Sequence, residues 1–380
     1  MRQTMLKTQT EAEKAFLVGV EAKTSADSWS IDSSLEELSY LARTAGAEVV
    51  GKLTQKLEKP SPTLYLGKGK LEELIKLSQQ HPYTVVIFND ELSPRQQRNL
   101  EEALKIKVID RTALILDIFA RRAHTREGQL QVELAQHQYL LPRLAGQWSH
   151  LERLGGGIGT RGPGESQLET DRRLIRRRIH RLQNQIEAVR RHRALYRQQR
   201  KKSRIAVVAL VGYTNAGKST LLNALSQSNV LVEDKLFSTL DPVTRRLFLP
   251  DGQQFLLTDT VGFIHKLPPS IIAAFRATLE ELTEADLLLH VVDITHHDAA
   301  EQFQTVEEII ADLDLTNKPQ LTVLNKMDLA AGNQEEMNAL ALAVPVKPPD
   351  DATVVISALK GWGLDKLLEM IATHLRQNLL

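Results

Sequence analysis

Cysteine is absent from the 380-residue chain, and aromatic residues make up only 5% of it. Without cysteine the protein can form neither disulfides nor thiolate metal sites, so any metal ion must be bound through oxygen or histidine. Long apolar runs are missing as well. No stretch reaches the roughly twenty residues of a membrane-spanning helix, and residues 1–14 lack the apolar core of a secretory signal. We therefore expect a cytoplasmic, water-soluble protein without stable membrane insertion.

The chain is longer than one hydrophobic core usually supports, since cores seldom grow beyond about 250 residues before splitting. Hydrophobic residues make up 42% and charged residues 25%, which is ordinary for a folded protein. The formal net charge is only +1, but the charges are unevenly distributed, with many arginines between residues 172 and 204. The sequence therefore predicts several domains and one basic segment suited to an anionic partner.

Residues 1–125 alternate strand-like runs with helix-like segments, which predicts an α/β domain with a mostly parallel sheet. The expected strands are 16–20, 47–50, 84–88 and 106–109, and the expected helices are 35–45, 70–79 and 93–104. Residues 126–203 lack strand patterns and carry a glycine-rich stretch at 155–164 between two helical segments. This middle part is predicted to be a two-helix arm with a glycine-rich tip.

The second arm helix has apolar residues at alternating steps of four and three, as a coiled-coil seam requires. These residues are Ile175, Ile179, Leu182, Ile186 and Val189. Arginines surround the seam at positions 172, 173, 176, 177, 178, 181, 190, 191, 193 and 197. They either contact nucleic-acid phosphates, which guanidinium groups bind with release of counterions, or form a solvated helix face.

A buried-strand pattern at 205–211 runs directly into a glycine-rich loop that a helix-like segment follows. Such a loop wraps phosphates with its backbone amides, and the helix N-terminus adds a partial positive charge. Lys218 is placed to reach the β and γ phosphates, and Ser219 to offer its hydroxyl to Mg²⁺. The predicted nucleotide contacts here are Gly212, Tyr213, Thr214, Asn215, Ala216, Gly217, Lys218 and Ser219.

Two further segments are predicted to respond to the γ-phosphate. Asp259 ends a strand-like run and can orient Mg²⁺ through water, while the Gly262 amide can sense the phosphate. Thr239 is expected to bind Mg²⁺ in the triphosphate state, with Thr244 as a substitute. The predicted contacts are Phe237, Ser238, Thr239, Leu240, Asp241, Asp259, Thr260, Val261 and Gly262; the catalytic set is Lys218, Thr239 and Gly262; the metal set is Ser219 and Thr239, with Asp259 behind water.

Base recognition is predicted at two later strand ends. Asp328 can accept hydrogen bonds from the ring N–H and exocyclic amine of guanine, which adenine cannot supply. Backbone amides of 357–360 can meet the guanine carbonyl oxygen. The residues are Asn325, Lys326, Met327, Asp328, Ser357, Ala358 and Leu359. These motifs, in this order on successive strand ends, predict that residues 204–380 form a doubly wound P-loop G domain that binds GTP and GDP.

Three features bear on this prediction. Phe263 occupies the place where a glutamine often positions the attacking water, so we expect slow intrinsic hydrolysis that a partner accelerates. Neither Arg245 nor Arg246 can be assigned as a built-in arginine finger from sequence. The lysine-glycine stretch at 67–70 lacks phosphate-loop spacing, and we interpret it as a turn and helix start.

With these residues in place, the chain closely resembles the HflX family within the Obg–HflX group of translational GTPases. The resemblance rests on the loop 212–219, on 237–244, on 259–263, on 267–281 and on the glycine-rich stretch 155–165. It implies a Mg²⁺-dependent GTPase that binds the large ribosomal subunit and its rRNA, is stimulated by it, and rescues or splits stalled or stress-damaged ribosomes. ATP use by the N-terminal region has also been suggested for the family. The sequence ends soon after the expected helix 364–375, so we do not expect the contacts that a C-terminal extension makes in some relatives.

Two alternatives remain open from sequence. One is a nucleotide-gated RNA-binding or chaperone-like module that does not split ribosomes. The other is a scaffold that never turns its nucleotide over, which the combination of Lys218, Ser219 and Asp259 disfavours. A monomer is expected.

Overall fold

The protein is described by a computed structural model, which covers residues 12–22, 29–80, 82–144, 163–202, 205–226, 236–237, 239–268, 271–272, 281–340 and 353–378. The chain forms two compact units, Met1–Asp117 and Ile118–Leu380. In the described residues no helix is long and apolar enough to cross a membrane. The predicted glycine-rich tip at 155–164 lies almost entirely outside the described residues.

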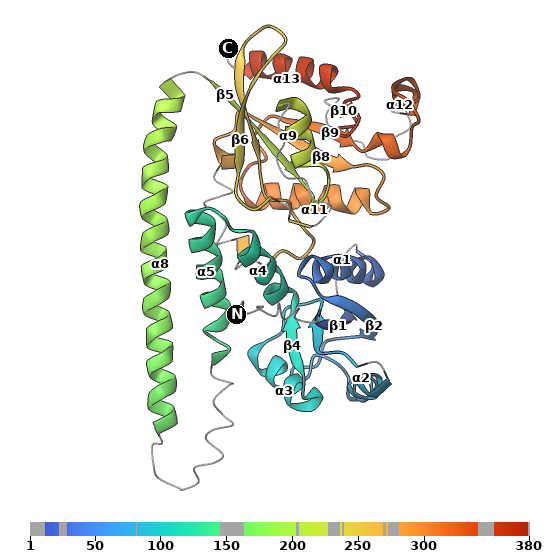
Figure 1. The fold of residues 1–380 in the computed structure, drawn as a ribbon, viewed down its shortest axis with the longest axis vertical. Coiled ribbons are helices and arrows are strands. Elements are labelled where there is room, and N and C mark those ends of the chain that lie inside the picture. Colours follow the sequence, from blue (N-terminus) through green and yellow to red (C-terminus); the bar gives the residue numbers. More distant parts are fainter. Residues whose placement is uncertain are drawn as a thin grey trace, which may run out of the picture. The chain divides into compact units, whose positions relative to one another are not determined.

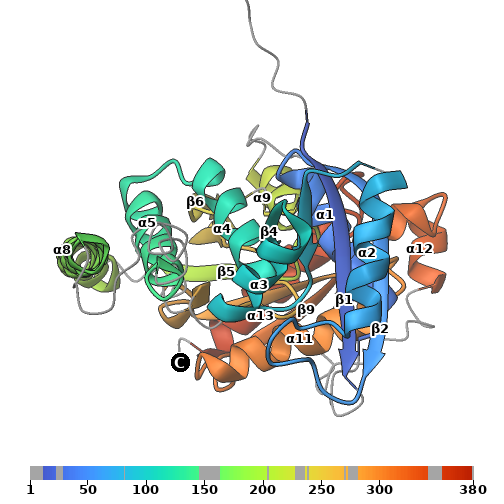
Figure 2. The same cartoon turned by 90° about the horizontal axis from the view of Figure 1, so that it is seen from below.

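The first unit holds a four-stranded, all-parallel sheet in the order β2-β1-β3-β4. Its elements are β1 (Lys14–Ala22), α1 (Ile31–Thr44), β2 (Glu48–Leu57), α2 (Lys68–Gln80), β3 (Val85–Phe88), α3 (Pro94–Leu104) and β4 (Lys107–Asp110). Helix α1 lies on one face of the sheet, and α2 and α3 lie on the other (Figures 1 and 2). This arrangement confirms the α/β fold predicted for the N-terminal part.

Strand β2 is longer than the predicted 47–50. Its second half was not predicted because exposed polar residues alternate there with buried or partly buried ones, so the segment is not an apolar run. An edge strand tolerates that pattern, since only one of its sides is paired. Helix α1 begins earlier than predicted because Ser30 caps it, accepting a hydrogen bond from the Ser33 amide at 3.0 Å. The stretch 67–70 is, as interpreted, the start of helix α2.

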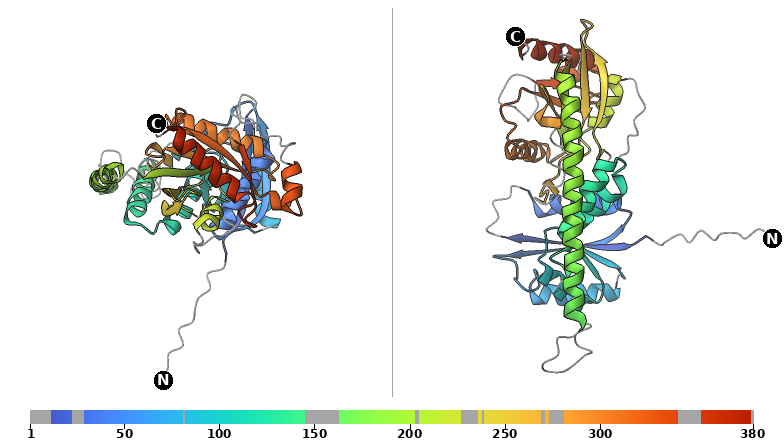
Figure 3. Two further views of the ribbon diagram at one scale, coloured as in Figure 1. Left: turned by 90° about the horizontal axis from the view of Figure 1, so that it is seen from above. Right: turned by 90° about the vertical axis from the view of Figure 1, so that its left-hand side faces the viewer.

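The arm consists of α5 (Arg126–Leu140) and α8 (Pro163–Lys202). Figure 3 shows α8 as one long, uninterrupted helix. Leu182 and Ile186 of the predicted seam are buried against Leu134 of α5. The Arg178 guanidinium also pairs with the Glu133 carboxylate across the two helices, at 2.6 Å. The seam therefore holds the arm together through apolar packing and one cross-helix ion pair.

The division into units falls inside α4 (Arg111–Arg122), whereas the N-terminal domain was expected to end at residue 125. The arm and the G domain, expected as 126–203 and 204–380, lie in one unit. The second unit begins within α4, rather than after residue 125, because the end of α4 packs on the G domain. The Phe119 ring meets the Phe237 ring edge-on, with 4.7 Å between their centroids.

The G domain is built on a six-stranded sheet in the order β10-β9-β8-β5-β7-β6. Its strands are β5 (Ala206–Gly212), β6 (Val243–Phe248), β7 (Gln254–Asp259), β8 (Leu287–Asp293), β9 (Gln320–Asn325) and β10 (Thr353–Val355). Its helices are α9 (Lys218–Ser226), α11 (Ala299–Asp312), the short 3-10 helix Met327–Leu329, α12 (Gln334–Leu340) and α13 (Leu364–Asn378). Among the described strands of this sheet, only the edge strand β6 runs antiparallel to its neighbour. The carboxyl ends of the parallel strands meet at one edge of the sheet, as the predicted doubly wound fold requires.

Candidate nucleotide-binding site

The phosphate loop joins the buried strand β5 to helix α9. Gly212 and Gly217 both have positive φ angles, 149° and 95°. A side-chain carbon at position 212 would overlap the Val291 carbonyl oxygen, and one at position 217 would overlap the Asn325 side chain. Only glycine therefore fits at these two positions, for reasons of space as well as conformation.

The Lys218 ammonium lies inside the loop. Its Nζ donates to the carbonyl oxygens of Gly212 at 3.1 Å and Tyr213 at 2.8 Å. An ammonium has three donors, so one remains for a phosphate. Burial lowers the pKa of Lys218 to about 8; the Asp259 charge opposes this effect, and Lys326 adds to it. A phosphate beside the buried ammonium would remove much of this desolvation cost.

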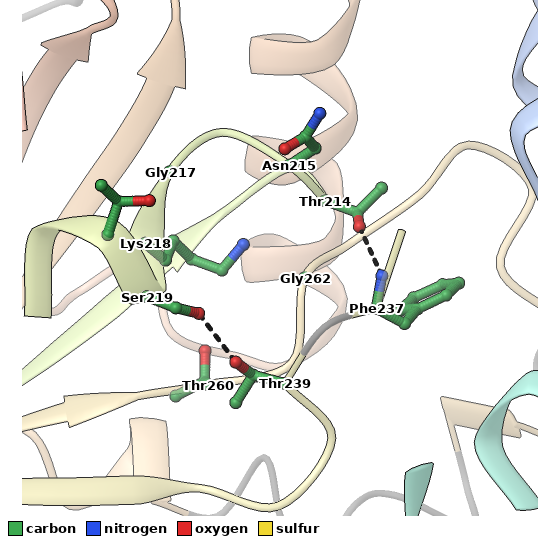
Figure 4. Close-up of a pocket in the computed structure, with 10 residues that line it drawn as sticks. Thr214, Asn215, Gly217, Lys218, Ser219, Phe237, Thr239, Thr260 and Gly262 are labelled. Atoms are coloured by element: carbon green, nitrogen blue, oxygen red, sulfur yellow. Dashed lines mark hydrogen bonds between the residues drawn. The ribbon is translucent and has the colours of Figure 1, made fainter. Parts of the chain in front are cut away.

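Three oxygen ligands converge beside the loop. The Ser219 and Thr239 hydroxyl oxygens are 2.7 Å apart (Figure 4). Both hydroxyls donate to Asp259 Oδ2, at 2.6 and 2.9 Å. Adjacent oxygens around an octahedral Mg²⁺ ion lie roughly 3 Å apart, since each metal–oxygen bond is about 2.1 Å long. The spacing and the all-oxygen donor set therefore fit Mg²⁺. Burial raises the pKa of Asp259, while Lys218 and both hydroxyls lower it.

The remaining lining of the pocket comes from both sides of the loop: Thr214, Asn215, Gly217, Lys218, Ser219, Thr220, Phe237, Thr239, Thr260 and Gly262. A side-chain carbon at position 262 would crowd the Thr214 backbone and the Lys218 ammonium. The Gly262 backbone consequently approaches the phosphate position closely. The Phe237 amide donates to Thr214 Oγ1 at 3.0 Å, which ties the first switch segment to the loop.

Phe263, which stands where a glutamine often positions water, is almost fully buried. Its amide donates to the Gly212 carbonyl at 3.1 Å, and its carbonyl accepts from the Thr214 amide at 2.7 Å. Phe263 thus anchors the second switch to the loop with its backbone, and its ring has no polar atom to align a water. Thr244, the substitute metal ligand considered above, instead contacts Thr258 on the sheet.

The base-recognition segments are tied to the phosphate loop through Asn325. Its Nδ2 donates to the Ala216 carbonyl at 2.9 Å, and its Oδ1 accepts from the Ala358 amide at 3.0 Å. Asp328 accepts a hydrogen bond from Ser357 Oγ at 2.5 Å. Asn325 therefore sets the spacing between loop and base pocket, and Ser357 orients the carboxylate that would read guanine.

Of the four backbone amides predicted to meet the guanine carbonyl oxygen, three already have hydrogen-bond acceptors within the protein. The amides of Ser357, Ala358 and Lys360 donate to Trp362 O, Asn325 Oδ1 and Ser357 Oγ. Within the described part of the chain the Leu359 amide makes no hydrogen bond. The Leu359 side chain is 72% exposed, so its backbone is accessible to a base.

Some predicted contacts lie elsewhere. Leu240 and Met327 are buried in the protein interior, and Val261 is nearly so. The Asp241 carboxylate accepts hydrogen bonds from His124 and Thr125 rather than lining the pocket. Ser238 and most of the predicted switch helix 267–281 lie outside the described residues.

Sequence reasoning missed Asp293, at the end of β8. Its carboxylate pairs with the Lys326 ammonium at 2.8 Å and accepts from the Thr295 amide and hydroxyl. Lys326 itself has a positive φ of 68°. Asp293 therefore holds the backbone turn that carries Asp328. The feature that could have indicated Asp293 is its position as the last residue of a fully buried strand. Acidic residues are common at strand ends for other reasons, so this position alone did not predict its role.

The fold and the order of these motifs define a P-loop GTPase. Three family descriptions match the chain in succession: GTP-binding GTPase N-terminal over residues 32–120, GTP-binding GTPase middle region over 122–200, and 50S ribosome-binding GTPase over 207–326. The crystal structure of SsGBP in complex with GDP resembles this fold, with 26% identity and a TM-score of 0.50 over 97% of this chain and 100% of that one.

Similar proteins of known family lead to the same class of protein. The GTPase HflX of Caldanaerobacter subterraneus subsp. tengcongensis is 51% identical over 369 residues, which cover 96% of this chain and 81% of the relative. The GTPase HflX of Escherichia coli K12 is 44% identical over 341 residues, which cover 90% and 79%. The chain belongs to the HflX family, it binds guanine nucleotides and it hydrolyses GTP. The resemblance proposed from the motifs is thereby confirmed.

Proposed function

We propose that this GTPase binds the large ribosomal subunit through rRNA and rescues or splits stalled or stress-damaged ribosomes in the cytoplasm. The observation that carries the proposal is the basic groove of α8. The groove is lined by Arg173, Arg176, Arg177, His180, Arg181, Asn184, Gln185 and Ala188. The spacing of these residues places them on one face of the helix, opposite the seam that contacts α5.

The charge balance of the basic groove favours a polyanion. No carboxylate lines it, and Arg173, Arg177 and Arg181 make no ion pair within the described residues. Arg176 has a partner in Glu169, at 3.7 Å, but both side chains are more than 60% exposed, so this pair contributes little. Free guanidinium groups at helical spacing suit RNA phosphates, and a match to the family described as 50S ribosome-binding supports the large subunit as the source of that RNA.

The catalytic roles follow from the pocket. Mg²⁺ would be held by Ser219 and Thr239, with Asp259 behind water, and would neutralise charge on the β and γ oxygens. Lys218 would hold the same oxygens from the loop side, and the Gly262 amide would bind the γ-phosphate. Because Phe263 cannot align water, this arrangement alone supports slow hydrolysis, and the bound subunit would supply or reposition the missing polar group.

The test is phosphate release from GTP with and without purified large subunits. Stimulation of at least about tenfold, lost in Lys218→Ala, supports the proposal. Replacing Arg173, Arg177 and Arg181 together by glutamine should abolish stimulation and leave basal turnover intact. The matched control replaces Arg245 and Arg246, exposed arginines of β6, by glutamine.

Three outcomes would overturn parts of this proposal. Equal stimulation by naked RNA would favour a nucleotide-gated RNA-binding module, and no stimulation at all would point to another partner for the basic groove. Stimulation without dissociation of whole ribosomes, followed by sedimentation, would contradict the splitting role.

A further inference from the structure

The first switch segment contacts the nucleotide site and the arm within a few residues. Thr239 faces Ser219 and Asp259 in the metal site. Two residues later, the carboxylate of Asp241 lies against the N-terminus of α5. A trans backbone extends by at most about 3.6 Å per residue, so the Cα atoms of Thr239 and Asp241 lie no more than about 7 Å apart. Pro242 further restricts the backbone of Asp241 to extended conformations.

The contact of Asp241 with α5 is specific. Oδ2 accepts from the amides of His124 at 2.9 Å and Thr125 at 2.8 Å, and Oδ1 accepts from the Thr125 hydroxyl at 2.5 Å. Thr125 is the N-cap of α5, and its hydroxyl oxygen accepts from the Gly128 amide at 3.0 Å. The carboxylate therefore satisfies amides that precede the helix, and the helix dipole favours its charge.

An independent contact anchors the other end of the same segment. The buried Phe237 ring packs edge-on against Phe119 at the end of α4, while the Phe237 amide donates to Thr214 in the phosphate loop. The switch segment is thus anchored at Phe237 by the phosphate loop and α4, and at Asp241 by the N-terminus of α5. Thr239 lies between these two anchors, so its position over the metal site depends on both.

We propose that Asp241 and Thr125 form a latch through which helix α5 positions Thr239 for GTP hydrolysis. When Thr239 leaves the metal site after hydrolysis, the short connection pulls Asp241 from α5 and opens the latch. Nucleotide state is thereby reported to the arm. Both residues are positioning residues, because neither touches the nucleotide pocket. The inference rests on the GTPase activity and is independent of the ribosomal partner.

Gly128 offers a sharp way to open the latch without touching either member. A side-chain carbon at position 128 would overlap Asp241 Oδ1 and displace the carboxylate. Alanine is also a better helix former than glycine, so Gly128→Ala should not weaken α5 itself. The matched control is Gly69→Ala in α2, where a side-chain carbon would meet no atom within 4 Å.

The experiment measures basal GTP turnover and GDP affinity of the full-length protein without ribosomes. Gly128→Ala should lower kcat by about three- to tenfold and change GDP affinity by less than about twofold, because Thr239 is used only in the triphosphate state. Thr125→Val should behave like Gly128→Ala, and Thr125→Ser, which keeps the hydroxyl, should restore turnover. Gly69→Ala should match the wild type.

A double-mutant cycle decides whether the effect passes through the carboxylate. In an Asp241→Ala background, Gly128→Ala should cause no further loss, since the overlapping atom is gone. Wild-type turnover in Gly128→Ala, an additive loss in the double variant, or a fall in GDP affinity parallel to kcat would each overturn the latch. Because ribosomes are absent, a failure of ribosome stimulation would leave this result unaffected.

Discussion

Both described sheets, one parallel and the other mostly parallel, carry polar residues at the carboxyl ends of their parallel strands, yet these residues have different roles. In the first unit, the fully buried Arg111 pairs with Glu37 and donates to Asn89 Oδ1 at 3.1 Å. Asp110 accepts from the amides of Leu92 and Ala113. These groups pair mainly with one another and with the adjoining turns, so they hold the unit together, although the buried Asn89 Nδ2 makes no hydrogen bond in the described residues.

In the G domain, by contrast, the polar residues surround a space. Lys218 keeps a donor for phosphate, and Ser219, Thr239 and Asp259 bring three oxygens to one point. The carboxyl edge of a parallel sheet therefore marks where a ligand can bind, but the partners of the polar groups decide whether one does. The following variants test this contrast.

The largest effect should follow from Arg111→Ala in the first unit. It leaves the buried Glu37 carboxylate without its cation, which costs about 3–5 kcal/mol of unfolding free energy. Urea unfolding measures the loss, and a double change to Arg111→Met with Glu37→Leu should restore much of it. A variant that stays folded but loses GTP turnover would break the comparison, because Arg111 would then serve the reaction.

Next in size is Lys218→Ala. Loss of the ammonium that holds the β and γ oxygens should reduce kcat/KM for GTP by about 10²–10³-fold without lowering the unfolding free energy, because burying the charged ammonium is itself costly. Turnover and thermal unfolding are measured side by side, with Lys366→Ala, at an exposed position of α13, as the control. Near-normal turnover would remove Lys218 from the catalytic set.

Asp328→Asn should weaken GTP binding by about 10²-fold, because the two guanine donors lose a carboxylate that Ser357 orients. The amide can instead donate to the extra carbonyl of xanthine, so binding of xanthosine triphosphate should improve. Competition against a fluorescent GDP analogue measures both. Parallel weakening of both nucleotides would show that Asp328 shapes the pocket without reading the base.

The smallest effect is a pH dependence. Burial lowers the Lys218 pKa to about 8, so free protein loses this positive charge above pH 8. GDP affinity should fall by roughly five- to tenfold between pH 7.5 and 9, because phosphate binding requires the ammonium. Stability without nucleotide should change oppositely, since the cost of burying the charge disappears as pH rises from about 8 toward the unfolded value of about 10.4. Lys218→Met should flatten both profiles.

The phosphate loop and base motifs could be predicted because their chemistry is written in consecutive residues. Gly212, Lys218 and Ser219 have fixed spacing after a buried strand, and the order of Asp259, Asn325 and Ser357 along the chain gives their positions on strand ends. The position of Phe263, where a glutamine often positions water, could be predicted for the same reason. Boundaries were less predictable: polar β2 resembles a loop until its edge position in the sheet is known.

The contacts of Asp241 and Arg111 could not be predicted from local sequence. Asp241 looked like a nucleotide contact because it lies two residues from Thr239, yet its carboxylate meets Thr125, 116 positions away. Arg111 directly follows strand β4, and no local pattern shows that it is buried against Glu37, 74 positions earlier. Such partners come from elements distant in the chain, and many arrangements satisfy the same local pattern.

The class of protein, the nucleotide and the order of its contacts could be predicted from the amino-acid sequence, because phosphate and guanine recognition depends on short motifs with rigid local geometry. The tertiary structure alone decided which carboxylates face the ligand and which hold helices. That choice depends on packing between distant elements, since a buried charge takes whichever partner the fold brings within hydrogen-bonding distance.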